Sequence, residues 1–293
     1  MANLTDIPRV GFRPPVGYAF DIEVFPANDW LKRVPAEHFR YPSRLDFHQL
    51  ILVTQGQFRH TVDFRLESPD SGSLLAMRPG QVQRFEANNI WDGWVILFRP
   101  ESFQTTANMG KAPPGLFVED IPVQLMLDAT TFTAMQQAMA QMHKDASMSG
   151  PMQLINTLER AQLQALLTRL QLASAQRLAL PSDNSSLSKH FRKFRHATEQ
   201  SFHEWHQISA YAKALGISEK TLSRAAQQLT GLSAKSYLST RIALEAKRML
   251  AYTSWPIAQV ADKLGFDEAT NFIKFFRREA GCAPSEFRKQ HRG

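Results

Sequence analysis

A pattern of short helix, glycine and second helix occurs twice in the last third of the chain, and this repeat constrains the fold more than any other feature. The first copy runs from Ile208 to Gly231, and the second runs from Ile257 to Gly281, 49 residues further along. The second copy carries one extra residue after its inner glycine. A repeat of this kind predicts two copies of one small helical unit in an all-α region.

Each unit has the residues that a tight corner between two helices requires. A small alanine in the first helix lets the second helix pack closely. A glycine follows where the first helix ends, because glycine readily adopts the left-handed backbone found there. A good N-cap residue then precedes the second helix. The matching positions are Ala212 and Ala261, Gly216 and Gly265, and Ser218 and Asp267.

The second helix of each unit is predicted to have one apolar face and one polar, basic face. The expected buried residues are Leu222, Ala225 and Leu229 in the first unit and Phe272, Phe275 and Phe276 in the second. In a helix-turn-helix motif, one side of the second helix packs and the other side enters the major groove of DNA. A single helical corner is common in proteins that bind no DNA, but two in register favour the DNA-binding interpretation.

The segment between the units is predicted to be one helix, Ala234–Tyr252. Its 19 residues span roughly 28 Å at about 1.5 Å per residue. One turn of DNA measures about 34 Å. A rigid spacer of this length would place the two second helices in successive major grooves on one side of a duplex.

The distribution of charge agrees with a polyanionic partner for this region. Residues 183–293 contain 18 Lys and Arg against 10 Asp and Glu, whereas residues 1–182 contain 16 against 17. The whole excess of positive charge, +7 for the chain, therefore lies in the last third. A well-solvated basic surface with no nucleic-acid partner is the alternative explanation.

The first two thirds of the 293-residue chain predict a second domain of a different class. Apolar or alternating runs at residues 47–54, 57–64, 73–78 and 94–99 indicate short strands of a small sandwich or barrel. Helical patterns follow at residues 129–147 and 152–176, and residues 179–186 are polar and proline-containing. The predicted fold is therefore α+β with two domains, residues 1–178 and 187–293, joined by a linker at 179–186.

Composition excludes several other classes of protein. The chain has one cysteine, Cys282, so it has neither an internal disulfide nor a cysteine-rich metal site. It has no apolar run long enough to cross a membrane, and residues 1–10 lack the apolar core of a signal peptide. We therefore expect a cytoplasmic protein without a membrane partner.

Four further motifs occur in the C-terminal region. They are GLSAKSYL from Gly231, RIALEAKRML from Arg241, VADKLGF from Val260, and NFIKFFRREAGCAPSEFR from Asn271. With these motifs, residues 187–288 resemble the DNA-binding domain of the AraC/XylS family of bacterial transcription regulators. The resemblance implies a transcription regulator, in most members an activator, with operator DNA and RNA polymerase as partners.

The resemblance also implies which residues contact DNA, since the family uses the exposed first two turns of each recognition helix. The residues at these positions are Glu219, Lys220, Ser223, Arg224, Ala269, Thr270, Asn271 and Lys274. Lys and Arg side chains suit guanine, and Asn suits adenine. Four more basic residues are predicted to contact phosphates, which add affinity without sequence information. These are Lys235, Arg241, Arg277 and Arg278. For each residue the alternative is a solvated surface side chain.

The N-terminal region resembles the cupin-like effector domain of many family members. Residues 44–56 and 72–85 carry the resemblance. Metal-binding cupins have a His-x-His pair and a later histidine, but Ser43, Leu45 and Gln83 stand at those positions here. His48 and His60 are too few to hold a metal by themselves. We therefore expect no metal and no other cofactor in this domain.

The effector is expected to be a small organic molecule, and an aromatic compound or a carboxylate would suit the predicted lining. That lining is Arg44, His48, Arg78, Gln83, Arg84, Trp91 and Trp94. The alternative is that the tryptophans belong to the core and the arginines to the surface.

Two further questions stay open at this stage. The leucine stripe of residues 152–176, which includes Leu163 and Leu167, is predicted to form a homodimer, although it could pack on its own barrel instead. A cupin enzyme with a basic helical appendage, such as an oxygenase or isomerase, is the alternative function. An enzyme would need metal ligands or an acid–base pair at pocket positions, and the metal ligands are missing. We therefore predict a protein that is not an enzyme.

Overall fold

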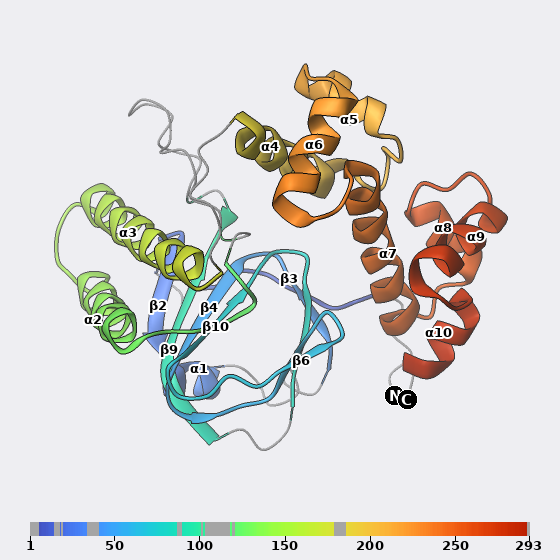
Figure 1. Ribbon diagram of the computed structural model, residues 1–293. Coiled ribbons are helices and arrows are strands. Elements are labelled where there is room, and N and C mark those ends of the chain that lie inside the picture. Colours follow the sequence, from blue (N-terminus) through green and yellow to red (C-terminus); the bar gives the residue numbers. More distant parts are fainter. Residues whose placement is uncertain are drawn as a thin grey trace. The chain divides into compact units, whose positions relative to one another are not determined.

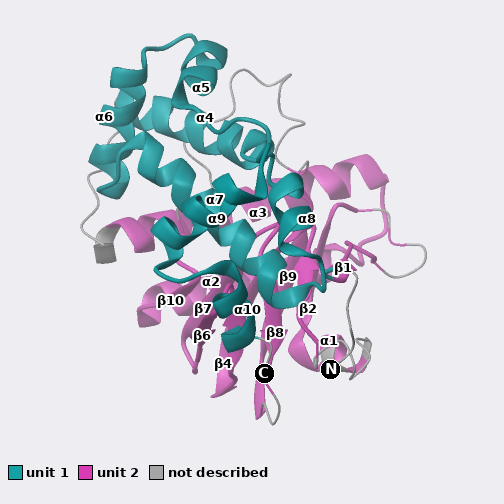
Figure 2. Ribbon diagram, turned by 90° about the vertical axis from the view of Figure 1, so that its right-hand side faces the viewer, with its two compact units in different colours: residues 1–7, 183–293 teal, residues 8–182 magenta. Residues whose placement is uncertain are grey.

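A computed structural model describes residues 6–14, 18, 20–33, 41–86, 90–100, 102, 118, 121–178 and 186–291. The chain forms two compact units (Figure 2): Pro8–Ser182, and Asp183–Gly293 together with Met1–Ile7. The first is rich in β-sheet and the second is helical, which confirms the α+β class with two domains. Most of the predicted linker, residues 179–185, lies outside the described residues, so the exact domain boundary stays a prediction.

Pro8–Ser182 is built on two five-stranded sheets (Figure 1). The first has the order β1-β3-β8-β5-β6 and the second the order β10-β7-β4-β9-β2. The strands are β1 (Arg9–Val10), β2 (Ile22–Pro26), β3 (Ser43–Leu45), β4 (His48–Gln57), β5 (His60–Val62), β6 (Arg65–Glu67), β7 (Ser73–Met77), β8 (Val82–Phe85), β9 (Ile90–Phe98) and β10 (Gln124–Met126).

One predicted strand is shorter than expected. Residues 57–64 were expected to form a single strand, but β5 ends at Val62. Asp63 and Phe64 adopt positive φ angles of 47° and 71°, so the chain turns there into β6. Residues other than glycine rarely adopt this conformation, and the apolar pattern alone does not reveal it.

Both faces of the second sheet are buried, because successive side chains of a strand point to opposite faces. Ile51 and Val53 of β4 belong to the core between the two sheets, where Trp91 and Phe85 also lie. Trp30 of α1 (Ala27–Arg33) packs into the same core at ring-centroid distances of 4.9 Å from Phe85 and 6.2 Å from Trp91. We call this core the barrel interior.

Leu50 and Leu52 of β4 lie on the other face of this sheet, in a separate core formed with two helices. The helices are α2 (Ala129–Asp145) and α3 (Met152–Leu178), and both confirm helices expected from the sequence. Leu163 and Leu167 of α3 are at most 2% exposed in this core. The prediction that these two leucines form a dimer contact is therefore wrong, because they pack on their own domain.

The helical unit contains seven described helices. They are α4 (Ser186–Ser201), α5 (Ile208–Leu215), α6 (Glu219–Thr230), α7 (Ala234–Tyr252), α8 (Ile257–Lys263), α9 (Ala269–Ala280) and α10 (Pro284–His291). The bounds of α7 are those predicted from the sequence. Helix α7 contacts α6 on one side of the unit and α8, α9 and α10 on the other, so it joins the two halves (Figure 1).

A buried carboxylate on α3 lacks a partner. Glu159 is 0% exposed, and neither of its carboxylate oxygens has a hydrogen-bond partner. Burial, and secondly the nearby Asp145, raises the pKa of Glu159 to about 7. Asp145 itself accepts hydrogen bonds from the side-chain amides of Gln141 (2.7 Å) and Gln162 (2.6 Å). Glu159 is therefore a group in this core whose charge state changes near neutral pH.

We predict that Glu159→Gln stabilises the protein more at pH 8 than at pH 5. A carboxyl group with a raised pKa stabilises the fold while it is protonated, and this contribution is lost as the pH rises from the usual glutamate pKa through about 7. The wild type should therefore lose roughly 2–3 kcal/mol relative to the variant across this interval. Thermal melts of both proteins at the two pH values measure the effect. An equal difference in melting temperature at pH 5 and pH 8 would show that Glu159 does not titrate in this way.

Candidate nucleic-acid interface and ligand-binding unit

The first helical corner has the predicted geometry. Helix α5 ends at Gly216, which adopts a left-handed φ of 65°. Ser218 caps α6, because its hydroxyl oxygen accepts a hydrogen bond from the Thr221 N–H at 3.1 Å. Leu222 and Ala225 are fully buried, as expected. Leu229 is 36% exposed, so its predicted burial is wrong, and the neighbouring residues 227–230 of the last turn of α6 are exposed as well.

The second corner follows the same plan with one difference. Gly265 adopts a φ of 77°, and Phe272 and Phe276 of α9 are fully buried, whereas Phe275 is only half-buried. The N-cap of α9 is Glu268 rather than the predicted Asp267, and it makes no side-chain capping bond. The extra residue in this copy moves the start of the helix by one position.

The first two turns of both recognition helices remain accessible. On α6, Glu219, Lys220 and Arg224 are exposed, and Ser223 is half-buried beside Leu222. The predicted positions on α9 have a similar pattern of exposure. Thr270, Asn271 and Lys274 are exposed and Ala269 is half-buried. Both helices thus have the packed side and the polar side that a recognition helix needs.

Three of the four predicted phosphate contacts are exposed basic residues. Lys235 lies in the first turn of α7, and Arg277 lies in the last turn of α9. Arg278 is 63% exposed, and its guanidinium pairs with Glu279 at 2.8 Å and lies over the Phe275 ring. Because these contacts leave most of its surface in water, Arg278 remains accessible to a phosphate.

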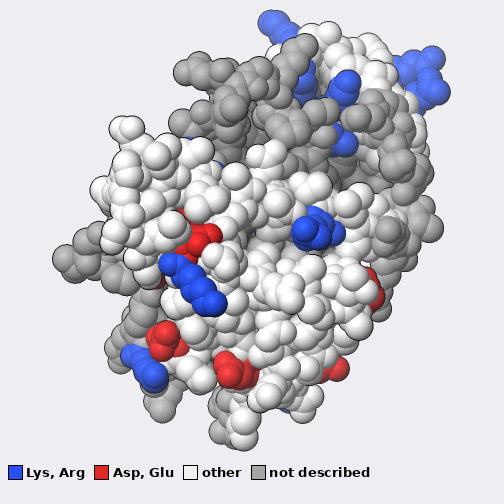
Figure 3. Space-filling view, turned by 90° about the vertical axis from the view of Figure 1, so that its left-hand side faces the viewer, with Lys and Arg blue, Asp and Glu red and all other residues white. Residues whose placement is uncertain are grey.

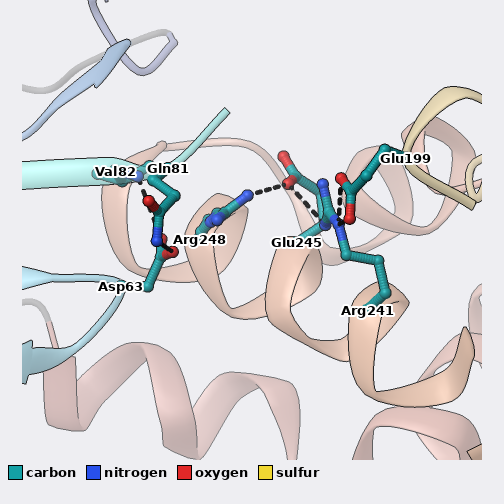
Figure 4. Close-up of polar contacts among 7 residues, drawn as sticks. All are labelled: Asp63, Gln81, Val82, Glu199, Arg241, Glu245 and Arg248. Carbon is teal, nitrogen blue, oxygen red and sulfur yellow. Dashed lines mark hydrogen bonds and ion pairs between the residues drawn. The ribbon is translucent and has the colours of Figure 1, made fainter. Parts of the chain in front are cut away.

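Arg241 has a structural role instead (Figure 4). Its side chain is only 12% exposed and lies over the Phe202 ring, with 4.0 Å between the guanidinium carbon and the ring centroid. The guanidinium forms ion pairs with Glu199 of α4 at 2.8 Å and with Glu245 at 3.3 Å. The structure therefore corrects the assignment of Arg241 to phosphate contact, because its hydrogen-bond donors already hold α4 against α7.

The buried end of this network adds a second arginine. Glu245 and Arg248 are each 3% exposed and form an ion pair at 2.9 Å. Removing one partner of a buried pair leaves an uncompensated charge and typically costs about 3–5 kcal/mol. The sequence did not reveal this network, because basic residues on a helix have the same pattern whether they pair internally or face DNA.

The second helical corner also contacts the segment between α4 and α5, which the sequence did not predict. A Cβ atom at Gly265 would lie 2.0 Å from the carbonyl oxygen of His203, in the segment between α4 and α5. The Nε2–H of His206 donates a hydrogen bond to the Leu264 carbonyl oxygen at 2.7 Å, and the His206 ring packs 4.7 Å from the Phe266 ring. The turn of the second corner is thus fixed against the segment that precedes the first corner.

The structure does not bring the seven predicted effector residues together. Trp91 and Gln83 have side chains in or beside the barrel interior, with exposures of 6% and 9%. Trp94 packs instead against the core shared with α2 and α3. His48 lies on that same face, stacked on Phe98 at 4.8 Å, and burial, followed by the charge of Arg78, lowers its pKa to about 3.

The three predicted arginines all lie outside the barrel interior. Arg44 and Arg84 each stand between two buried neighbours on their strands, so their side chains point away from the interior. Arg84 pairs with Glu86 at 3.0 Å. Arg78 donates hydrogen bonds to the carbonyl oxygens of Val118 and Ile121. The proposed set of cationic groups around one ligand is therefore wrong.

Single polar atoms without a hydrogen-bond partner occur on side chains between the sheets. Gln49 is 1% exposed and His60 is 0% exposed, and burial lowers the pKa of His60 to about 3. The Gln49 Nε2, His60 Nδ1 and Gln83 Oε1 atoms have no hydrogen-bond partner. Such groups usually bind ordered water or a polar ligand. No group of three or more potential metal-ligating His, Cys, Asp or Glu residues occurs among the described residues.

An open cavity of about 370 Å³ lies on the outer face of the second sheet, beside α2. It is lined by residues of β2, β4, β9 and α2, and Trp94 is the one predicted effector residue among them. Its size falls in the range of small-molecule sites, about 300–1,000 Å³. The barrel interior is thus not the only candidate location for a ligand.

A helical unit with two helix-turn-helix corners, attached to a β-barrel unit, defines a DNA-binding transcription regulator with a ligand-binding domain. Comparison with known families agrees with this class. Residues 32–180 match the AraC-like ligand binding domain, and residues 211–290 match a helix-turn-helix domain. The chain belongs to the AraC family of transcription regulators.

Individual relatives are distant in sequence but similar over most of their length. The HTH-type transcriptional activator RhaS of Shigella dysenteriae is 24% identical over 291 residues, 99% of each chain. RhaS of Enterobacter sp. (strain 638) is 23% identical over 246 residues, 83% of this chain and 86% of the relative.

Two solved structures are also similar. The DNA-binding domain of AdpA, solved in complex with a target DNA, is 27% identical and covers 37% of this chain and 95% of its own, with a TM-score of 0.32. ToxT from Vibrio cholerae is 8% identical and covers 93% of this chain and 98% of its own, with a TM-score of 0.39.

Within the described part of the chain, no helix combines the length and apolar character needed to span a membrane.

We predict that the two corner glycines differ in their tolerance of substitution. Asparagine accepts a left-handed backbone better than most residues, so Gly216→Asn should cost about 1 kcal/mol or less, since a Cβ there meets no atom within 4 Å. Gly265→Asn has the same backbone requirement but places its Cβ against the His203 carbonyl, so it should lower the melting temperature far more. Thermal melts of the two variants provide the comparison. Equal losses would mean that the contact of Gly265 with His203 does not constrain the fold.

Proposed function

We propose that this protein activates transcription by binding an operator with both recognition helices while its barrel unit binds a small organic effector. The observation that carries the proposal is the pair of exposed polar helix faces, on α6 and α9, joined through the single helix α7. The name of the RhaS relatives, transcriptional activators, supports activation over repression. RNA polymerase would then be a protein partner, and the cytoplasm would be the compartment.

The proposed base contacts come from the exposed turns of α6 and α9. Lys220 and Arg224 are four residues apart, so they share one face of α6, while Leu222 points into the core. Both side chains suit guanine, and Asn271 of α9 suits adenine. Glu219, Ser223, Ala269, Thr270 and Lys274 complete this surface. Lys235, Arg277 and Arg278 are proposed to bind phosphates.

We further propose that the protein is a homodimer through the outward face of α3. Leu154, Leu158 and Leu172 are 66%, 39% and 61% exposed. With the exposed Ala161, Ala165 and Thr168 they form a line whose spacing alternates between four and three residues. This spacing is the seam of a coiled coil. Figure 3, viewed from the side of α2 and α3, shows that uncharged side chains cover most of this surface.

The seam is self-complementary about a two-fold axis. If two copies of α3 lie antiparallel and cross at position 163, Leu154 meets the second copy's Leu172, and Leu158 meets the second copy's Thr168. Ala161 meets the second copy's Ala165, and these small side chains allow the helices to approach closely at the centre. An isologous dimer requires this matching of a surface with itself.

The enzyme alternative has less support. The predicted lining residues are spread over different faces of the barrel unit and form no acid–base pair around one cavity. Membership of a family of transcription regulators supports a binding function for the barrel unit. We therefore propose a regulator that is not an enzyme, and that binds its effector without a metal.

We predict that Arg224→Ala weakens binding to an operator selected from random DNA by about 1–3 kcal/mol and weakens binding to random DNA far less, because it removes a base contact. Lys235→Ala should weaken binding to both DNAs equally and reduce the salt dependence by about one phosphate contact. Titrations of full-length protein with both DNAs at several salt concentrations measure these effects.

Arg241→Ala is the control for this experiment. It should lower the melting temperature, since it breaks the pairs with Glu199 and Glu245. Arg224→Ala should leave the melting temperature unchanged. If Arg224→Ala lowers both affinities equally, or melts early, the exposed face of α6 is not the base-reading face.

We predict that Leu154→Glu combined with Leu172→Glu produces folded monomers. The substitutions place like charges opposite one another in the antiparallel seam, whereas each single chain already exposes these positions to water. Leu66→Glu, at a residue of β6 that is 48% exposed, is the matched control and should leave the dimer intact. Sedimentation equilibrium measures the oligomeric state of the three proteins. A monomeric wild type, or a dimeric double variant, would contradict the proposed dimer contact at this seam.

A further inference from the structure

The cavity beside α2 lies at an irregularity in the second sheet. The pairing of β4 with β9 shifts register between Val53 and Gln55, which marks a β-bulge. Gly93 stands opposite, where a Cβ atom would lie 1.9 Å from the Leu52 carbonyl oxygen, so the two strands approach too closely for any other residue. Bulges commonly occur beside binding sites, because they redirect side chains away from the regular pleat.

The described lining of this cavity combines aromatic rings with one acidic side chain. Trp94 of β9 and Phe132 of α2 are half-buried and supply the aromatic walls. Gln136, one turn further along α2, is exposed at the rim. Among the described residues that line the cavity, Asp92 is the only charged one, and none of them is Lys, Arg or His.

Asp92 is held in place by the backbone. Its Oδ1 accepts a hydrogen bond from the Gly93 N–H at 2.7 Å. The carboxylate therefore has a fixed position at the bulge, and its second oxygen remains as an acceptor for a ligand. A carboxylate next to aromatic faces attracts an organic cation by a charge-assisted hydrogen bond and by cation–π interaction.

We propose that this cavity binds a small aromatic ammonium ion, with its ammonium group on Asp92 and its ring against Trp94 and Phe132. The proposal deepens the proposed effector response and rests on it for biological meaning. An ammonium ligand replaces the carboxylate ligand expected from the sequence, because the arginines that favoured an anion do not line this cavity. Arg44 and Arg84 point outward from the first sheet, and Arg78 donates hydrogen bonds to backbone carbonyls.

The position of the cavity also suggests how its occupant acts. A ligand there contacts β9 and α2 together, and α2 packs on α3, whose outward face is the proposed dimer seam. Binding would therefore stabilise α2 in its place on the sheet, next to the helix that pairs with the second copy.

The test uses three probes with similar skeletons and different charges: tyramine, its neutral alcohol analogue tyrosol, and the anion 3-(4-hydroxyphenyl)propionate. Isothermal titration calorimetry on the full chain without DNA should show saturable binding of tyramine, about tenfold weaker binding of tyrosol, and no binding of the anion. Asp92→Asn keeps the oxygen that accepts the hydrogen bond from the Gly93 N–H, and it should weaken tyramine binding at least about tenfold.

Two substitutions on α2 provide the matched control. Gln136→Lys places a cation at the cavity rim and should abolish tyramine binding. Gln137→Lys adds the same charge at the next residue, which is also exposed but is not among the residues lining the cavity, and should leave binding unchanged. Each of three results would overturn the proposal: preferred binding of the anion, binding of neutral sugars in place of the amine, or tyramine binding that is unchanged by Asp92→Asn. Because no DNA is present, failure of operator binding would leave this result unaffected.

Discussion

The spacing between the two helix-turn-helix corners depends on α7 and on the contacts that hold it. Its inward residues, such as Ala246 and Leu250, are fully buried, and its buried Glu245 pairs with Arg241 and Arg248. The turn at Gly265 then packs directly on the His203 carbonyl oxygen. With both connections in place, the two recognition helices belong to one packed unit, and we propose that this unit fixes the distance between them.

The barrel unit follows a different constraint, since its second sheet is apolar on both faces. One face closes the barrel interior, and α2 and α3 must cover the other. The inner leucines of α3 meet that requirement, and its outer leucines remain exposed, where we propose that they pair with a second copy of the helix. The same arrangement forms the cavity at the bulge, because Phe132 and Gln136 of α2 stand over the irregular part of β9. Ligand binding and dimer formation are therefore proposed for neighbouring surfaces of one helical layer.

Sequence reasoning succeeded where the signal was local. The bounds of α7, the left-handed glycines and the burial of Leu222 and Phe272 all follow from caps, turns and helical periodicity. It failed where the outcome depended on packing between distant segments. Alternation along β4 and β9 separates two faces but does not say which face lines the barrel, so Trp94 and His48 were placed on the wrong side. Arg241 is a basic residue of the type that contacts phosphates, and only the position of Glu199 on α4 shows that its role is structural. No pattern in the sequence indicated the contact of Gly265 with His203.

The central claim is that α7 fixes the two recognition helices for successive major grooves of one duplex. Its 19 residues span roughly 28 Å, which suits one helical turn of DNA and cannot reach across two. The most direct measurement is the affinity of the protein for a selected operator with 5 or 10 base pairs inserted between the segments contacted by α6 and α9. The account predicts a loss of at least about 100-fold for both insertions. The 5-base-pair insertion turns the second segment to the opposite face of the duplex, and the 10-base-pair insertion restores the face but adds about 34 Å, which α7 cannot span. Restored affinity with the 10-base-pair insertion would contradict it, because the helical unit would then have to stretch.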